Sequence, residues 1–207
     1  MEGRTNPTDV SLAAAMRVIA GSLKGAAIRT PKGRSVRPTY DRVRESLFSM
    51  LEPELTDSAI LDLFAGSGSL GIESLSRGAR AATFVEKDPA TLSVLRENIR
   101  GLGLEDRSSV LKGDAVRLLD GPLPGAPFDV VFVDPPYATD LAEESLLLLG
   151  AGGLLDASAV VVVEHDSDRT LPAVSGGLLR YREKRYGGTS LDLYRSGAGR
   201  HERREDT

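Results

Sequence analysis

Residues 59–88 read AILDLFAGSGSLGIESLSRGARAATFVEKD, and their pattern indicates the fold class. The apolar run that opens it predicts a buried strand, and the glycine-rich AGSGSLG that follows predicts a loop. IESLSRG then predicts a helix that ends at Gly78, and RAATFVEKD predicts a second strand. This order of strand, loop, helix and strand is typical of a parallel sheet with crossover helices.

The same alternation continues toward the C-terminus. Helices are predicted for PATLSVLRENIRGLG, AVRLLD and DLAEESLLLLG, and strands for SSVLKGD, for residues 128–133 and for SAVVVVEH. SAVVVVEH is almost wholly apolar, which predicts burial on both faces. LLRYREKRYGGTSLDLYR alternates and predicts two antiparallel strands joined near Gly187–Gly188. We therefore expect a doubly wound, Rossmann-like α/β sheet in the order 3-2-1-4-5, with C-terminal antiparallel strands added.

The N-terminal part has a different character. MRVIAGSLKGAAIRT predicts a β-hairpin around residues 21–25, PKGRSVRP predicts a loop, and TYDRVRESLFSMLE predicts a helix with Thr39 as its N-cap. From Arg17 to Arg44 there are eight basic residues and one acidic residue, a net charge of +7 in a chain whose total is −4. This asymmetry favours a basic face that meets a polyanion, and the alternative is a solvated basic hairpin.

Composition excludes several classes of protein. The chain has 207 residues, no cysteine and two histidines, so disulfides and thiolate metal sites are excluded and a histidine metal cluster is not expected. No apolar run is long enough to span a bilayer, and no signal-peptide pattern opens the chain. We expect a cytoplasmic protein that uses no metal and contacts no membrane.

The glycine loop predicts a nucleotide-like cofactor. Gly66, Gly68 and Gly71 form G-x-G-x-x-G between a strand and a helix, and Glu86 ends the next strand where a ribose-binding acid belongs. The alternative is a tight turn that needs glycines for its backbone alone.

The acids around this loop favour one cofactor over another. Asp62, Asp114 and Asp134 follow strands that end beside the loop, and each carboxylate that faces a phosphate charge at about 4 Å costs on the order of 4 kcal/mol. The same acids are favourable toward the sulfonium and ammonium of S-adenosylmethionine. The charges therefore favour S-adenosylmethionine over NAD. Asp114 is a candidate acceptor for the adenine amino group, and it is also a candidate N-cap of the next helix.

The stretch Asp134-Pro135-Pro136-Tyr137 follows the fourth strand of the predicted sheet and should flank the cofactor. The Asp134 carboxylate and the Pro135 carbonyl offer two acceptors for an exocyclic NH₂ group. Tyr137 offers a flat surface on which a base can stack. The alternative is a rigid turn that ends a strand.

These motifs carry a family resemblance. DPPY resembles the motif of amino-methyltransferases that act on exocyclic nitrogens. RVIAGSLKG, RPTYDRVRESLFSML, LDLFAGSGSLGIESLSRGA, FVEKD, DPPY and EKRYGGTSLDLYR together resemble the RsmD family of bacterial 16S ribosomal RNA guanine-N2 methyltransferases, from about Arg17 to Arg195. The resemblance implies a class I methyltransferase fold, S-adenosylmethionine as methyl donor, and one guanine of 16S RNA in the small subunit or its assembly intermediate as substrate. It implies that the acid and the carbonyl of DPPY hold the amino group.

The expected site follows from both lines of argument. The candidate catalytic residues are Asp134, Pro135 and Tyr137. The candidate cofactor-binding residues are Asp62, Phe64, Ala65, Gly66, Gly68, Gly71, Glu86, Lys87, Asp114, Ala115 and Asp134. The candidate RNA-binding residues are Arg17, Lys24, Arg34, Arg37, Arg42 and Arg44, because cationic side chains match phosphate oxygens.

We expect four segments: a disordered N-terminus at 1–15, the basic hairpin and helix at 16–57, the methyltransferase domain at 58–196 and a charged tail at 197–207. We also expect a monomer. Three other functions remain open at this point: a DNA adenine or glutamine amide methyltransferase, an NAD-dependent oxidoreductase, and a non-catalytic RNA-binding assembly factor. The Asp at position 134 counts against a glutamine methyltransferase, because those enzymes carry Asn there.

Overall fold

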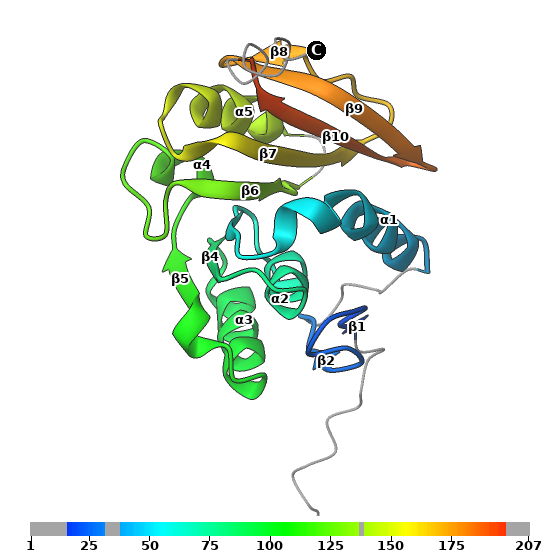
Figure 1. The fold of residues 1–207 in the computed structure, drawn as a ribbon, viewed down its shortest axis with the longest axis vertical. Helices are drawn as coiled ribbons and strands as arrows, with labels where there is room; N and C mark the ends of the chain where they lie inside the picture. The colour runs from blue at the N-terminus through cyan, green and yellow to red at the C-terminus, as the bar shows by residue number, and fades with distance from the viewer. Residues whose placement is uncertain (1–15, 32–37, 137–138, 198–207) are drawn as a thin grey trace, which may run out of the picture.

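The computed structural model describes residues 16–31, 38–136 and 139–197. Its main feature is an eight-stranded sheet in the order β5-β4-β3-β6-β7-β10-β9-β8 (Figure 1). The strands are β3 (Ala59–Asp62), β4 (Ala81–Glu86), β5 (Ser108–Lys112), β6 (Phe128–Val133), β7 (Leu155–Asp166), β8 (Val174–Ser175), β9 (Leu178–Tyr186) and β10 (Thr189–Ser196).

The first five of these strands in the chain are parallel, and their spatial order is the predicted 3-2-1-4-5. The helices between them are α2 (Ser69–Ser76), α3 (Pro89–Gly101), α4 (Ala115–Leu118) and α5 (Leu141–Ala151), with a short 3₁₀ turn at Glu105–Arg107. β10 runs antiparallel to both β7 and β9, so the predicted C-terminal hairpin is also confirmed. The two-residue β8 at the sheet edge was not predicted.

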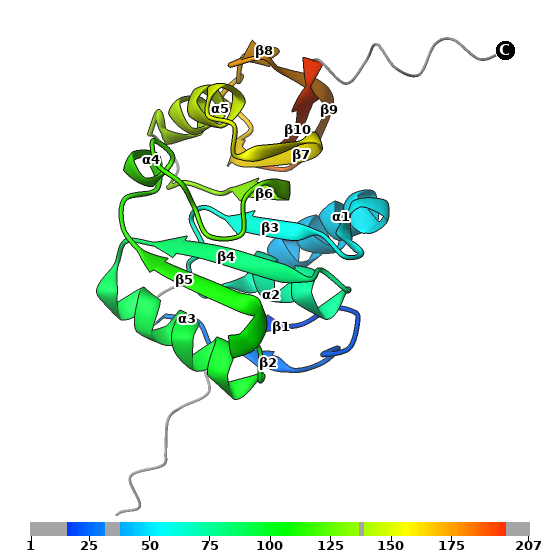
Figure 2. The same cartoon turned by 60° about the vertical axis from the view of Figure 1, so that its left-hand side comes forward.

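Helices cover both faces of the sheet (Figure 2). Alternate residues of β7 point to opposite faces: Val160 and Val162 join one hydrophobic cluster, and Val161 and Val163 join the other. The first cluster contains side chains of α1, α2 and α3, and the second contains side chains of α4 and α5. This burial from both sides explains why β7 has a continuous apolar sequence rather than an alternating one.

The N-terminal hairpin joins β1 (Met16–Arg17) to β2 (Ala27–Ile28), and α1 (Pro38–Leu55) follows. The prediction of Thr39 as the N-cap is wrong by position, because α1 already begins at Pro38, a residue suited to the first helical position. Side chains of the hairpin and of α1 join the first hydrophobic cluster, so this segment shares a core with the sheet. The division near residue 57 stays a prediction.

Within the described residues, no helix combines the length and apolarity that crossing a bilayer would require. The predicted segments 1–15 and most of 197–207 lie outside the described residues.

Candidate functional site

A cleft of about 650 Å³ opens at the carboxyl ends of β3, β4, β5 and β6. Open α/β sheets bind their ligands at this position, because the strand order changes direction between β3 and β6. The volume is in the range of cofactor and small-molecule sites. The cleft is lined by Leu63, Phe64, Gly66, Val85, Glu86, Lys87, Asp88, Pro89, Thr91, Gly113, Asp114, Ala115, Asp134, Pro136 and Leu141.

The three glycines of the loop have different functions. The Gly66 amide lines the cleft and donates to Oε2 of Glu86 at 2.9 Å. Gly68 is the N-cap of α2 with a φ of 85°, in the left-handed region that favours glycine. At Gly71 a Cβ atom would lie 2.2 Å from Cε1 of Phe84, so this glycine allows α2 to pack closely on β4. Gly68 and Gly71 therefore shape the loop and the helix rather than line the cleft.

Asp62 lies behind the cleft and is buried. Its Oδ2 accepts a hydrogen bond from the Gly71 amide at 3.0 Å, which fixes the end of β3 against α2. Burial raises the pKa of Asp62 to about 7; the Gly71 hydrogen bond opposes this rise, and the charges of Asp134 and Glu86 add to it. Asp62 therefore adds a negative charge behind the cleft only near and above neutral pH.

Glu86 is held by the backbone at the end of β4. Besides the Gly66 amide, it accepts from the Asp88 amide at 2.7 Å through Oε1. Each carboxylate oxygen has a second lone pair, so Glu86 keeps acceptor capacity toward a ligand hydroxyl.

Lys87 and Asp114 meet at the edge of the cleft, with 2.9 Å between Nζ and Oδ2. The other oxygen of Asp114 accepts from the Arg117 amide at 3.3 Å, so Asp114 is the N-cap of α4 as well as a cleft residue. The hydrogen bonds from Lys87 and from the Arg117 amide hold the pKa of Asp114 below its ordinary value. Asp114 is therefore ionised at neutral pH.

The segment after β6 forms the wall of the cleft next to β3. Asp134 is half-buried and lines the cleft together with Pro136, while Pro135 is buried. The Thr139 hydroxyl donates to the Pro136 carbonyl at 2.8 Å. Tyr137, the predicted stacking residue, lies outside the described residues.

The arrangement brings four acidic residues, Glu86, Asp88, Asp114 and Asp134, to one cleft, with Asp62 behind them. Such a cleft suits a cationic ligand and disfavours a pyrophosphate. Across the described residues, no group of three or more histidine, cysteine or acidic side chains is arranged to hold a metal ion.

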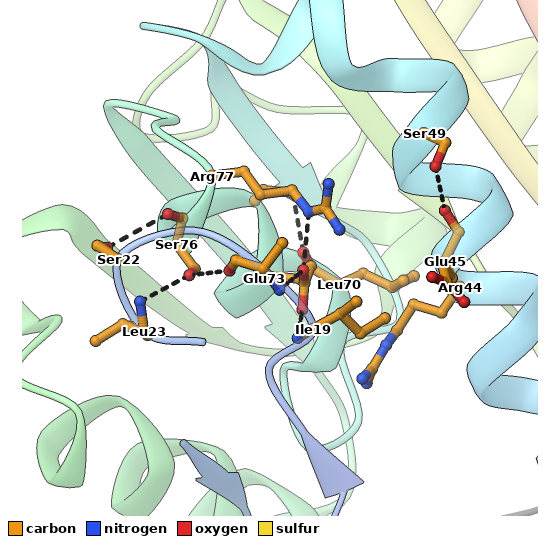
Figure 3. A network of polar contacts seen from close by, with 12 residues as sticks. Ile19, Ser22, Leu23, Arg44, Glu45, Ser49, Leu70, Glu73, Ser76 and Arg77 are labelled. Carbon is orange, nitrogen blue, oxygen red and sulfur yellow. Dashed lines mark hydrogen bonds and ion pairs between the residues drawn. The ribbon is translucent and has the colours of Figure 1, made fainter. Parts of the chain in front are cut away.

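The N-terminal hairpin is attached to α2 by a buried carboxylate (Figure 3). Glu73 is fully buried and accepts from the Ile19 amide at 2.7 Å, the Ala20 amide at 3.0 Å and Nε of Arg77 at 2.8 Å. The Arg77 guanidinium also lies 5.0 Å above the ring of Phe48 on α1. One acid therefore joins the hairpin, α2 and, through Arg77, α1.

Two further polar side chains complete this attachment. The Ser76 hydroxyl accepts from the Leu23 amide at 3.0 Å and donates to the Ala20 carbonyl at 2.5 Å (Figure 3). Asn98 on α3 is bonded to both the amide and the carbonyl of Arg29 at 2.9 Å, and it also donates to the Ser67 carbonyl in the glycine loop. The hairpin is thus fixed to α2 near its start and to α3 near its end, and Asn98 on α3 also contacts the glycine loop.

The predicted RNA-binding residues divide into three groups. Arg17, Lys24 and Arg42 are exposed, while Arg34 and Arg37 lie outside the described residues. The prediction that Arg44 contacts phosphate is wrong, because its side chain is only 2% exposed. Its guanidinium donates to the Arg17 carbonyl and lies 3.8 Å from Asp41, so it connects α1 to the hairpin.

Comparison with known proteins identifies the family. Residues 16–195 match the family described as conserved hypothetical protein 95. The ribosomal RNA small subunit methyltransferase D of Escherichia coli strain K12 is 39% identical over 179 residues, which cover 86% of this chain and 89% of that protein. The chain belongs to the RsmD family. The Haemophilus influenzae protein of the same name is 37% identical over 182 residues, which cover 87% of this chain and 94% of that protein.

A solved structure of a putative methyltransferase from Escherichia coli has a TM-score of 0.76 at 39% sequence identity. The match covers 88% of this chain and 98% of that one, so the RsmD-family fold extends over nearly the whole described region. The resemblance and the fold class predicted from the sequence are confirmed.

The structure of this RsmD-family chain brings most of the predicted cofactor residues together. Seven of them line the cleft: Phe64, Gly66, Glu86, Lys87, Asp114, Ala115 and Asp134. Asp62, Ala65, Gly68 and Gly71 do not line it; the Ala65 amide instead bonds to the Val85 carbonyl at 2.9 Å. Asp88 and Thr91 line the cleft but were not predicted, although Asp88-Pro89 is a recognisable helix start directly after a strand.

Proposed function

We propose that this protein transfers a methyl group from S-adenosylmethionine to the exocyclic N2 of one guanine in 16S ribosomal RNA. The observation that carries the proposal is the acidic cleft at the ends of β3, β4, β5 and β6, which has Asp134 and Pro136 of the DPPY segment in its wall. Relatives named ribosomal RNA small subunit methyltransferase D support the reaction class and the RNA substrate.

The residues present fit S-adenosylmethionine. Four acidic residues line the cleft, and the one basic side chain among the lining residues, Lys87, is paired with Asp114. Glu86 would accept from ribose hydroxyls, and Asp114 from the adenine amino group. When bound, S-adenosylmethionine supplies an electrophilic methyl group on a sulfonium, and the acids favour that positive charge.

The DPPY segment would hold the acceptor amine. A guanine amino group is conjugated with its ring and is a poor nucleophile, so its orientation carries much of the catalysis. The Asp134 carboxylate and the Pro135 carbonyl would each accept one N–H, which directs the nitrogen lone pair toward the methyl group. Methyl transfer would form the nitrogen–carbon bond and break the carbon–sulfur bond, with the electron pair left on sulfur, and the nitrogen would lose one proton to Asp134 or water. No strong base is needed, because the transient ammonium is very acidic.

The basic N-terminal segment would bind the RNA. Arg17, Lys24 and Arg42 are exposed on the hairpin and on α1, and they would contact phosphates together with Arg34 and Arg37. The target guanine must leave its stack to reach Asp134. The proposal places the protein in the cytoplasm, acting on the small subunit or its assembly intermediate. A monomeric state stays a prediction.

Nucleoside analysis tests the proposed reaction. Incubation with methyl-labelled S-adenosylmethionine and undermethylated small subunits should place the label in N2-methylguanosine. A variant with both Arg34→Ala and Arg37→Ala should keep its affinity for S-adenosylhomocysteine and lose at least about tenfold in RNA methylation, because two phosphate contacts are removed. Label in any other nucleoside would exclude guanine-N2 specificity, and label in protein alone would exclude an RNA substrate.

The pKa of Asp62 leads to a pH dependence of cofactor affinity. Because this pKa is raised to about 7, Asp62 is protonated at pH 5.5 and ionised at pH 8, so the cationic cofactor should bind more tightly at the higher pH. If binding lowers this pKa by about one unit, affinity rises about tenfold in total across the titration. Calorimetric titrations with S-adenosylmethionine at several pH values from 5.5 to 8 measure this change in affinity. Asp62→Asn is the control, because the variant lacks the ionisable carboxyl at position 62. Any pH dependence that remains in this variant comes from the ligand or from other groups. An equal pH slope in both proteins would contradict the prediction.

A further inference from the structure

We propose that Arg169, on the turn after β7, is a positioning residue for the DPPY segment, an inference that rests on the proposed function. The guanidinium donates hydrogen bonds to three residues that follow that segment in the chain. Nη1 donates to the Thr139 carbonyl, and Nη2 donates to Oδ1 of Asp140 at 3.0 Å and to Oε1 of Glu143 at 2.8 Å. We call this set of contacts the Arg169 clamp.

The clamp is presented from a fixed turn. The Arg169 amide bonds to the Asp166 carbonyl at 3.0 Å, and the Asp168 amide bonds to Oδ1 of Asp166 at 2.9 Å. The Ser167 amide bonds to the Gly188 carbonyl at 3.1 Å in the β9–β10 turn. The backbone that carries the guanidinium is therefore held by the end of β7 and by the β9–β10 turn.

The clamp also fixes the start of α5. Asp140 is the N-cap residue of α5 but makes no capping bond with its side chain, which pairs with Arg169 instead. Glu143 lies in the first turn, and its second oxygen, Oε2, is buried with no hydrogen-bond partner among the described residues. Without Arg169 the Glu143 carboxylate would lose its ion-pair partner in a partly buried place, which is costly.

The described part of the DPPY segment, residues 134–136, therefore lies between two fixed points of the chain. β6 fixes the chain up to Val133, and the clamp fixes it at Thr139. Between them the Thr139 hydroxyl bonds to the Pro136 carbonyl, which couples the clamped end to a residue of the cleft wall. Because misplacing a reacting group by about 1 Å can cost on the order of a hundredfold in rate, the clamp should affect turnover more than binding.

The test is Arg169→Ala, assayed for methyl transfer, for S-adenosylhomocysteine affinity and for hydrogen exchange. We expect turnover to fall at least about tenfold, the cofactor dissociation constant to change less than about threefold, and amides 144–147, the first of which donates to the Asp140 carbonyl, to exchange at least about fivefold faster. Arg169→Lys should recover part of the turnover. Arg80→Ala is the matched control, because Arg80 also bridges a carbonyl (Asp57) and a carboxylate (Asp129) but lies at the amino ends of the strands. It should leave turnover and exchange at amides 144–147 unchanged.

Asp140→Ala provides a second variant that does not endanger folding, because the Asp140 side chain is 83% exposed. It should reduce turnover about twofold to fivefold alone and add no further loss to Arg169→Ala. Full turnover in Arg169→Ala, equal losses of turnover and cofactor affinity, or additive losses in the double variant would each overturn the inference. If wild-type protein fails to methylate RNA, the proposed function fails, and hydrogen exchange at amides 144–147 still decides whether the clamp exists.

Discussion

Replacing Asp134 by Ala should lower methyl transfer to small-subunit RNA at least about a hundredfold, equivalent to about 2.7 kcal/mol of transition-state stabilisation. The Asp134 carboxylate lines the cleft and would accept a hydrogen bond from one N–H of the guanine amine. Without this bond the lone pair of the amine nitrogen is no longer directed toward the methyl group. Affinity for S-adenosylhomocysteine should change less than about threefold, because Glu86 and Asp114 remain. Steady-state turnover and calorimetry measure the two quantities separately.

Asp134→Asn is the matched variant for this experiment. The amide keeps one oxygen acceptor and the size of the side chain but removes the negative charge. We expect its turnover to lie between those of the wild type and Asp134→Ala, which would separate hydrogen bonding from charge. If Asp134→Ala methylated RNA at the wild-type rate, the assignment of Asp134 as a catalytic residue would be wrong, and an RNA-binding assembly protein that keeps the fold would become the better reading.

Replacing Glu73 by Ala should lower the free energy of unfolding by about 3–5 kcal/mol, the cost of removing one partner of a buried ion pair. The substitution leaves the Ile19 and Ala20 amides and the Arg77 guanidinium without their common acceptor. Two part-buried backbone donors and one cation then lack this acceptor. Chemical denaturation with a constant m-value is the appropriate measurement.

Glu45→Ala is the control for that loss. Glu45 is also a helical glutamate, but it is exposed on α1, so its replacement should change stability by less than about 0.5 kcal/mol. Glu73→Gln should fall between the two, since its single oxygen can accept fewer of the three hydrogen bonds. Equal stability of Glu73→Ala and Glu45→Ala would show that the hairpin is held by its apolar contacts alone.

The sequence predicted the sheet and much of the cleft because both follow local rules. Apolar runs with glycine and proline between them mark the strands, and Glu86, Asp114 and Asp134 stand at or just after strand ends, where parallel strands present their side chains together. Periodicity therefore sufficed to place three acids in one cleft. It did not show that Asp62 turns toward the Gly71 amide, because that depends on the local path of the chain.

Long-range contacts explain the remaining errors and omissions. In the sequence Arg44 is one of several cations in a basic segment. Only the folded structure shows that its side chain is buried and donates to the Arg17 carbonyl. Glu73 and Asn98 have no local signal either, because an acid or amide in a helix usually faces solvent. Their partners lie 54 and 69 residues away in the chain. The predicted stacking residue Tyr137 stays a prediction.

The attachment of the hairpin has a consequence for the order of folding. Residues 16–29 are synthesised before their partners on α2 and α3, and contacts this distant in sequence form late because a long segment must be ordered first. A growing chain that does not yet include α2 and α3 lacks the residues to which the β1–β2 pair docks. The exposed basic residues of the hairpin, Arg17 and Lys24, are therefore fixed in position only after α2 and α3 have formed.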